Sequence, residues 1–314
     1  MKRVRIAKDI MVTKLVTVTP ETDVFEAVSN LLKYNLTGAP VIDEKGHYVA
    51  VFSERPCLSV MMAAWHAAGA DALRAANLPK AGDVMAKNLV TLTPDVDVFD
   101  AIALLLQRRI SGAPVLDRSR RFLGVFSEHA SMTVLLDAAY QQMPTSRVRS
   151  FIDADRKRII TEDVGLLDVA QKFLDTQYRR LPVLRGETLV GQISRRDVLR
   201  SGQATSGPRS RLEAWREWMT GAASAPASES TQVAAYMDTS APTVSEDTDL
   251  LQIAQIFRKT SARRVPVVQD GQLTGQISRR DLLYAINDLI AHSPKRENPL
   301  LYLSSLDHTD PPIH

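Results

Sequence analysis

The sequence is poor in the residues that catalytic and metal centres most often use. Cys57 is the single cysteine, so the chain cannot form an internal disulfide, and it gives no support to a zinc or redox motif. The six histidines are scattered without H-x-x-x-H or H-E-x-x-H spacing, and neither a G-x-G-x-x-G segment nor a P-loop is present. We therefore expect an inert thiol, no enzymatic activity, no metal site and no catalytic cofactor.

Long apolar runs and a strong excess of charge are also lacking. No stretch approaches the roughly 18 apolar residues of a membrane span, and the basic start MKRVRIAKDIM leads into no apolar signal segment. The net charge is only +3, and the basic residues are spread along the chain instead of forming the stripe typical of nucleic-acid binders. These features predict a cytoplasmic protein that does not insert into membranes.

Four copies of one sequence unit account for most of the chain. The copies align without a gap over their first halves, and they start at Thr19, Thr93, Thr161 and Ser245. A proline follows at the same distance in every copy: Pro40, Pro114, Pro182 and Pro266. A serine then comes before the last helix of each copy: Ser53, Ser127, Ser194 and Ser278. Internal repeats of this kind set the architecture of the whole chain.

Each copy has the pattern of a β-α-β-β-α unit. Helix N-caps are expected at Asp23, Asp97 and Asp249, and Gly165 takes the fourth place. Apolar residues recur at helical spacing in the first copy: Val24, Phe25, Val28, Leu31 and Leu32. A β-branched run after the proline, a turn and a second apolar run predict a hairpin, and a helix opens at the serine.

The proline-centred strand and the closing motif, GQISRRD in the last two copies, resemble the CBS domain. The resemblance covers most of the chain. It implies an α+β fold in which four β-α-β-β-α CBS repeats pair into two Bateman modules with small mixed sheets. Shared local sequences pair the first copy with the second and the third with the fourth. The four-copy layout is similar to that of the gamma subunit of AMP-activated protein kinase.

The repeats also predict where the domains lie. The first module is expected within 1–143, with repeats at 8–65 and 81–138, and the second has repeats at 146–200 and 233–290. Residues 201–232 are rich in Gly, Ser, Pro and Ala at their ends, which predicts a linker around a short amphipathic helix. That helix could pack on its own module, dock a partner or touch a membrane. Residues 291–314 are expected to form an irregular tail or an arm across a neighbour.

The two modules carry different residues at three aligned positions. Three residues after the serine, the last two copies carry Asp197 and Asp281 where the first two carry Pro56 and Ala130. Two residues before the proline, the comparison is Arg180 and Arg264 against Gly38 and Gly112. One position earlier, it is Arg179 and Arg263 against Thr37 and Ser111. These differences place the candidate ligand site in the second module, and we expect the clefts of the first module to be empty or to bind something else weakly.

The resemblance implies a role for each of these residues. The aspartates would accept hydrogen bonds from ribose hydroxyls, and Ser194, Ser278 and the four arginines would contact phosphate. Charge-assisted bonds and the planar guanidinium fork suit these contacts. Adenine would lie between the paired sheets near backbone groups of Ile160, Thr161, Thr243 and Val244.

Structural alternatives stay open for the same residues. Ser-x-x-Asp at a helix start is also a capping box, and Arg179, Arg180, Arg263 and Arg264 could be solvated helix ends. A further set of arginines is expected to be solvent-exposed instead of ligand-bound: Arg195, Arg196, Arg279 and Arg280.

Three functions are compatible with this pattern. The leading hypothesis is a non-catalytic sensor that binds AMP, ADP, ATP or an S-adenosyl compound such as S-adenosylmethionine in the second module and signals to an unidentified protein partner by a conformational change. The second is a ligand-independent scaffold. The third is an RNA- or DNA-binding protein that uses the eight arginines of the RRxP and SRRD segments. Monomer and homodimer are both open, because two modules in one chain can pair internally.

Overall fold

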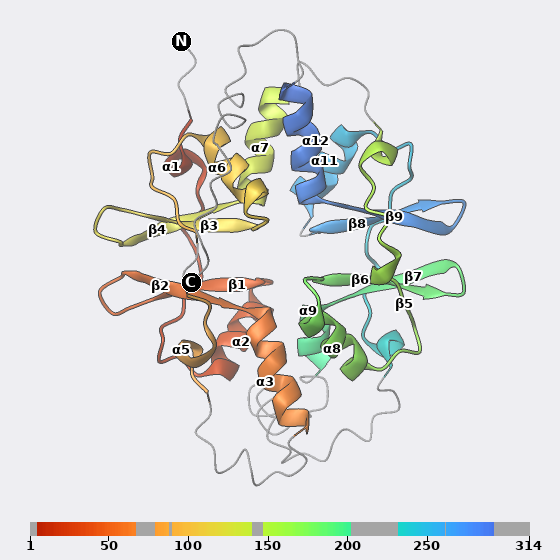
Figure 1. Ribbon diagram of the computed structural model, residues 1–314, viewed down its shortest axis with the longest axis horizontal. Helices are drawn as coiled ribbons and strands as arrows, with labels where there is room; N and C mark the ends of the chain where they lie inside the picture. Colours follow the sequence, from red (N-terminus) through yellow and green to blue (C-terminus); the bar gives the residue numbers. More distant parts are fainter. Residues whose placement is uncertain are drawn as a thin grey trace, which may run out of the picture.

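A computed structural model describes residues 5–66, 79–87, 90–139, 147–201, 232–260 and 262–291 of the chain. Residues 202–231 of the predicted linker and 292–314 of the predicted tail lie outside this part, and so does the amphipathic helix predicted between the third and fourth repeats. Figure 1 shows the four repeats at the corners of the molecule, with the first module on one side and the second on the other.

Each repeat is built from a helix, an antiparallel hairpin and a second helix. The first repeat contains α2 (Val24–Lys33), β1 (Gly38–Ile42), β2 (Tyr48–Ser53) and α3 (Glu54–His66). The second contains α6 (Val98–Gln107), β3 (Gly112–Leu116), β4 (Phe122–Ser127) and α7 (Glu128–Ala139). The third contains β5 (Ile160–Thr161), α8 (Leu166–Asp175), β6 (Arg180–Arg185), β7 (Thr188–Ser194) and α9 (Arg195–Ser201). The fourth contains α11 (Leu250–Lys259), β8 (Arg264–Gln269), β9 (Gln272–Ser278) and α12 (Arg279–Ala291).

The first strand of each predicted unit is short. It forms β5, parallel to β6, in the third repeat. In the other repeats it is a single parallel bridge, between Val18 and Val41, Leu92 and Val115, and Val244 and Val267. The predicted β-α-β-β-α order is therefore confirmed, and so is the α+β class with small mixed sheets. In the second module the hairpins join in one sheet with the order β5-β6-β7-β9-β8.

The N-caps of the first helices are as the sequence predicts. The Asp23 side chain accepts hydrogen bonds from the backbone N–H groups of Phe25 and Glu26. Asp97 and Asp249 cap α6 and α11 by accepting one such bond each, from Phe99 and Leu251 respectively. Gly165 precedes α8 and offers no side-chain cap. A carboxylate at this place satisfies N–H groups that the helix leaves without a partner.

Short lead-in segments before the repeats are exchanged within each module. The segment before the first repeat includes α1 (Ala7–Ile10), and its Val12 pairs with Val125 of the second repeat. Conversely, the segment before the second repeat includes α5 (Ala81–Val84), and its Ala86 pairs with Val51 of the first repeat. The second module repeats this exchange with segments that include η1 (Val148–Phe151), η2 (Arg156–Arg158) and η3 (Val233–Ala235). Asp153 pairs with Gln276 there, and Asp238 with Gln192. Each module is therefore one interlocked unit.

Two apolar cores run across the boundary between the modules. One contains buried side chains of the first and third repeats, such as Leu58 and Phe173, and the other contains those of the second and fourth, such as Met132 and Phe257. The helices α3 and α7 of the first module carry this contact, against α8 and α9 and against α11 and α12 respectively (Figure 1). No helix of the described part is long and apolar enough to cross a membrane.

Candidate functional site

The hairpins of the third and fourth repeats join in one sheet, and we call the face of these hairpins that points away from the helix-covered cores the cleft of the second module. Val265 and Ile277 are fully buried in the core that the helices cover. Side chains alternate between the two faces of a strand, so Arg264 and Ser278 lie on the opposite face. They are also register partners of β8 and β9. The same alternation places Arg180 and Ser194 on this face of β6 and β7.

The Ser-x-x-Asp segments form capping boxes at the starts of α9 and α12. Asp281 Oδ2 accepts hydrogen bonds from the backbone N–H of Ser278 and from its hydroxyl, both at 2.7 Å, and the Asp281 N–H donates to Ser278 Oγ at 3.2 Å. Ser194 and Asp197 make the same three contacts at 2.8, 2.6 and 3.4 Å. The caps use Oδ2 alone, so they orient each carboxylate through that oxygen. Arg200 Nη1 lies 3.9 Å from Asp197 Oδ1, and the caps leave the acceptor sites of Asp281 Oδ1 for another partner.

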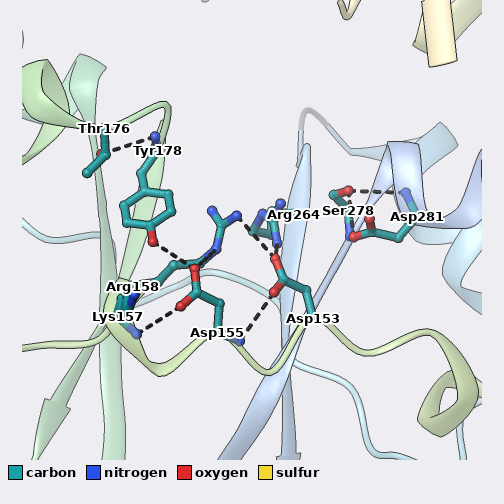
Figure 2. A network of polar contacts seen from close by, with 9 residues as sticks. All are labelled: Asp153, Asp155, Lys157, Arg158, Thr176, Tyr178, Arg264, Ser278 and Asp281. Carbon is teal, nitrogen blue, oxygen red and sulfur yellow. Dashed lines mark hydrogen bonds and ion pairs between the residues drawn. The ribbon is translucent and has the colours of Figure 1, made fainter. Parts of the chain in front are cut away.

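Arg264 belongs to a network of charged side chains beside Ser278 and Asp281 (Figure 2). Its Nη1 donates to Asp153 Oδ2 at 2.8 Å, and Arg158 Nη2 lies 3.2 Å from the same oxygen. Arg158 Nε lies 3.6 Å from Asp155 Oδ2. The side chains of the Arg264–Asp153 pair are only 18% and 27% exposed, so solvent screens this ion pair only partly.

Tyr178 contacts two residues of this network, Asp155 and Arg158. Its hydroxyl donates to Asp155 Oδ2 at 2.7 Å, and the Arg158 guanidinium lies over its ring, 4.3 Å from the ring centre. The hydrogen bond from Tyr178 lowers the pKa of Asp155 and raises that of Tyr178 itself. Burial lowers the pKa of Arg158. The sequence did not predict roles for Asp153, Asp155 and Arg158, because these residues precede the aligned part of the third repeat. The charged run DADRKR, in which they lie, is the feature that could have indicated a polar site there.

The predicted phosphate-binding arginines are split between two places. Arg180 and Arg264 face the cleft, whereas Arg179 Nη1 donates to Ser111 Oγ of the first module at 3.3 Å. Arg263 is the equivalent of Arg179, and burial together with neighbouring arginines of the module boundary lowers its pKa. Successive residues at the start of a strand point to opposite faces, so the side chains of Arg179 and Arg180 lie apart although the residues are adjacent in the chain. A phosphate contact stays a prediction for all four arginines.

The expectation of solvent-exposed arginines in the SRRD segments was wrong. Arg195 and Arg279 are only 6% and 7% exposed. Their guanidinium groups donate to the carbonyl groups of Phe173 and Phe257, near the ends of α8 and α11. These carbonyls have no partner within their helices, so the arginines act as helix C-caps. Burial lowers the pKa of both arginines to about 10.

The second arginine of each SRRD segment reaches the first module. Arg196 Nη2 lies 3.3 Å from Glu54 Oε1, and Arg280 Nε lies 3.2 Å from Glu128 Oε1. Each glutamate comes directly after the serine that precedes the last helix of its own repeat. Burial raises the pKa of each glutamate, while the facing arginine opposes this shift. Arg196 and Arg280 stand two residues after the serines of their own repeats, so aligning the repeats does not match them with Glu54 and Glu128, and the pairing depends on how the modules face each other.

The residues predicted to surround adenine lie in different settings. Ile160 is 7% exposed and belongs to a core, whereas Thr161 is exposed. Thr243 and Val244 line a groove of about 560 Å³ against α11. The bridges make Val244 the equivalent of Ile160. A role in contacting adenine stays a prediction for all four residues.

The first module carries Gly38 and Gly112 at the positions that are Arg180 and Arg264 in the second. A Cβ atom at Gly38 would lie 2.9 Å from the carbonyl oxygen of Phe52, and one at Gly112 would lie 3.1 Å from that of Phe126. A larger residue at either position would therefore require the facing strand to shift. Among the described residues, no group of His, Cys, Asp and Glu side chains could hold a metal ion.

This architecture defines a protein of paired CBS domains. The CBS domain family model matches residues 7–55, 81–130, 153–203 and 233–288, which is more than half of the chain, so the chain belongs to this family. The recognition of four CBS repeats from the sequence is confirmed.

Several known proteins resemble the chain. The crystal structure of MJ1225 from Methanocaldococcus jannaschii, proposed as an archaeal homologue of the AMPK gamma subunit, is 22% identical, with a TM-score of 0.74 over 90% of this chain and 99% of that one. Inosine-5'-monophosphate dehydrogenase from the same organism is 24% identical over 40% of this chain, and the alignment covers 23% of the enzyme. Arabidopsis CBSX2 in complex with AMP is 24% identical over 42% of this chain and 97% of that chain, with a TM-score of 0.37. The alignments span less than half the length of the first two curated relatives, at 23% and 41%.

Proposed function

We propose that this protein is a non-catalytic sensor that binds an adenosyl ligand, such as AMP, ADP, ATP or S-adenosylmethionine, in its second module. The observation that carries the proposal is the coincidence of three groups on one face of each hairpin. An arginine and a serine are register partners there, and an aspartate three residues later holds its carboxylate beside the serine. In the first module, the corresponding positions carry Gly, Ser and either Pro or Ala.

The chemistry of these groups suits a ribose phosphate. The capping box fixes Oδ2 of Asp281 and leaves Oδ1 to accept from a ribose hydroxyl, and a hydrogen bond to an ionised acceptor is roughly twice as strong as a neutral one. An arginine can bind a phosphate through two parallel N–H groups. The serine hydroxyl already donates to the carboxylate, so its role is to orient that carboxylate.

A route for signalling follows from the SRRD segments. Ser194 and Asp197 face the cleft, whereas Arg196 between them holds Glu54 of the first module. Arg280 and Glu128 repeat this arrangement in the fourth repeat. A ligand that shifts the start of α9 or α12 therefore also shifts an ion pair at the module boundary. The size of this response is limited by the difference in ligand affinity between the two arrangements.

A ligand-independent scaffold is the second candidate, and the capping boxes favour it. Capping alone accounts for Ser-x-x-Asp at a helix start, and such a cap is worth about 1 kcal/mol. The nucleic-acid hypothesis loses support, because Arg195 and Arg279 are buried and Arg196 and Arg280 are paired with glutamates. These four arginines are half of the proposed basic surface.

Isothermal titration calorimetry distinguishes the sensor from the scaffold. The chain is titrated with AMP, ATP and S-adenosylmethionine, and the titrations are repeated with the double variant Asp197→Ala/Asp281→Ala. A matched control, Ser53→Ala/Ser127→Ala, alters the equivalent helix starts of the first module. The sensor predicts saturable binding that the double variant loses and the control keeps. A folded protein that binds none of the three ligands would leave the scaffold as the better account.

A further inference from the structure

The two halves of the second-module cleft are related by the internal repeat. Asp153 pairs with Gln276 of β9, and Asp238 pairs with Gln192 of β7 in the same antiparallel manner. Asp153 beside Arg264 in the fourth repeat is therefore equivalent to Asp238 beside the third repeat, whose arginine is Arg180. We name the half with Ser278 and Asp281 the fourth-repeat pocket, and the half with Ser194 and Asp197 the third-repeat pocket.

In the fourth-repeat pocket, the arginine is already bound by the protein itself. Asp153 accepts a hydrogen bond from Arg264 and forms an ion pair with Arg158. Its Oδ1 also accepts a hydrogen bond from the backbone N–H of Asp155, at 3.2 Å. Asp155 is in turn held by the hydroxyl of Tyr178. Figure 2 shows this chain of contacts running from Tyr178 to Arg264. A phosphate that approaches Arg264 would therefore compete with the Asp153 carboxylate for this guanidinium.

The third-repeat pocket does not contain this network. Asp238 Oδ1 instead accepts from the N–H and the hydroxyl of Ser240, at 3.0 and 2.8 Å. Arg180 pairs with Ser194 through the strand ladder, but its guanidinium makes no hydrogen bond or ion pair with any other residue in the part of the chain that the structure describes. Ser240 stands where the other lead-in segment has Asp155, and Ala262 stands where the other loop has Tyr178. The second carboxylate and the phenol that complete the network are therefore replaced by small residues.

We propose, on the basis of the sensor function above, that a phosphate-bearing adenosyl ligand binds once per chain, in the third-repeat pocket, with Arg180 on its phosphate. A phosphate monoester carries roughly one to two negative charges at neutral pH. In the fourth-repeat pocket, it would lie beside the carboxylates of Asp153 and Asp155 and would break a partly buried ion pair. In the third-repeat pocket, it meets a guanidinium that has no competing carboxylate contact.

Calorimetric titration with AMP tests this assignment through single variants. Wild-type protein is expected to bind about one AMP per chain. Asp197→Ala and Arg180→Ala should each weaken binding at least about tenfold, as expected for the loss of a hydrogen bond to a charged group. Asp281→Ala and Arg264→Ala should change affinity less than about twofold. Circular dichroism of each variant checks that it is folded.

A gain of binding provides a second readout. Asp153→Ala removes the carboxylate that holds Arg264, so the stoichiometry should rise from about one to about two AMP per chain. Asp238→Ala is the matched control, and it should leave the stoichiometry at one. Two equal sites in the wild type, or a loss confined to Asp281→Ala and Arg264→Ala, would overturn the assignment while the sensor function stands. Absence of binding of AMP, ATP and S-adenosylmethionine to the wild type would instead overturn the sensor function.

Discussion

The ion pair between Arg196 and Glu54 joins the two modules, and its two halves should respond unequally to substitution. The side chains are 13% and 7% exposed and their charged atoms lie 3.3 Å apart. Burial raises the pKa of Glu54 although Arg196 pulls that pKa down, so the desolvation of the carboxylate outweighs the attraction. Arg196→Gln leaves a buried carboxylate without its nearest cation, whereas Glu54→Gln removes the desolvated charge itself.

The two substitutions should therefore change the free energy of unfolding by different amounts. Arg196→Gln should lower the free energy of unfolding by about 3 kcal/mol at neutral pH, the lower end for one-sided removal of a buried ion pair. Glu54→Gln should lower it by less than about 1 kcal/mol, because Arg196 keeps its hydrogen bond to Asn35 Oδ1. The double variant should then be more stable than Arg196→Gln alone, by roughly 2 kcal/mol. Urea unfolding followed by circular dichroism measures all four proteins.

The pH dependence provides an independent check on this ion pair. Because the native pKa of Glu54 lies above its unfolded value, the native protein binds more protons in the interval between the two, and stability falls as pH rises through that interval. Without Arg196 the native pKa rises further, so the loss caused by Arg196→Gln should shrink as the pH is lowered from neutral towards the ordinary pKa of glutamate. Equal losses for the two single variants, or an additive double variant, would show that the desolvation of Glu54 does not dominate this ion pair.

Three further outcomes follow from the described contacts. Tyr178→Phe should raise the pKa of Asp155 towards its ordinary value in a carboxyl NMR titration, because the variant loses the hydrogen bond from the Tyr178 hydroxyl. The lowered pKa stabilises the folded protein above the unfolded pKa of Asp155, and this contribution, which is lost as the pH falls through the native pKa, should be smaller in the variant. An unchanged pKa of Asp155 would contradict the hydrogen bond. Gly275→Ala should lower the unfolding free energy by about 1–3 kcal/mol, because its Cβ would collide with the Ile152 side chain; a neutral effect in urea unfolding would argue against the exchanged lead-in segment. Burial raises the pKa of the Cys57 thiol well above its ordinary value, so a thiol reagent should label it only after unfolding, and rapid labelling of the native protein would contradict its burial.

Local rules predicted the repeat unit well because each element carries its own signal. Asp23 and Asp97 stand one residue before an apolar helical pattern, and both cap the helices as expected. The apolar positions of the first copy are buried, from Val24 to Leu32. Capping and amphipathic spacing act within a few residues, so they can be read without knowledge of the tertiary structure.

The arrangement of the candidate site depends on contacts that the sequence does not encode locally. Arg179 and Arg180 are adjacent in the chain, yet one reaches Ser111 of the first module and the other faces the cleft. Asp153 reaches Arg264 only because the lead-in segments are exchanged between repeats. Both outcomes follow from strand faces and chain exchange across more than 60 residues, which aligned repeats alone do not reveal.

A crystal structure of the chain grown with AMP shows which module holds the ligand. We expect AMP in the second module, with its ribose on Asp197 and its phosphate on Arg180, and no AMP between the hairpins of the first module. AMP bound beside Gly38 or Gly112 of the first module, or a second module that stays empty at saturating AMP, would contradict this expectation.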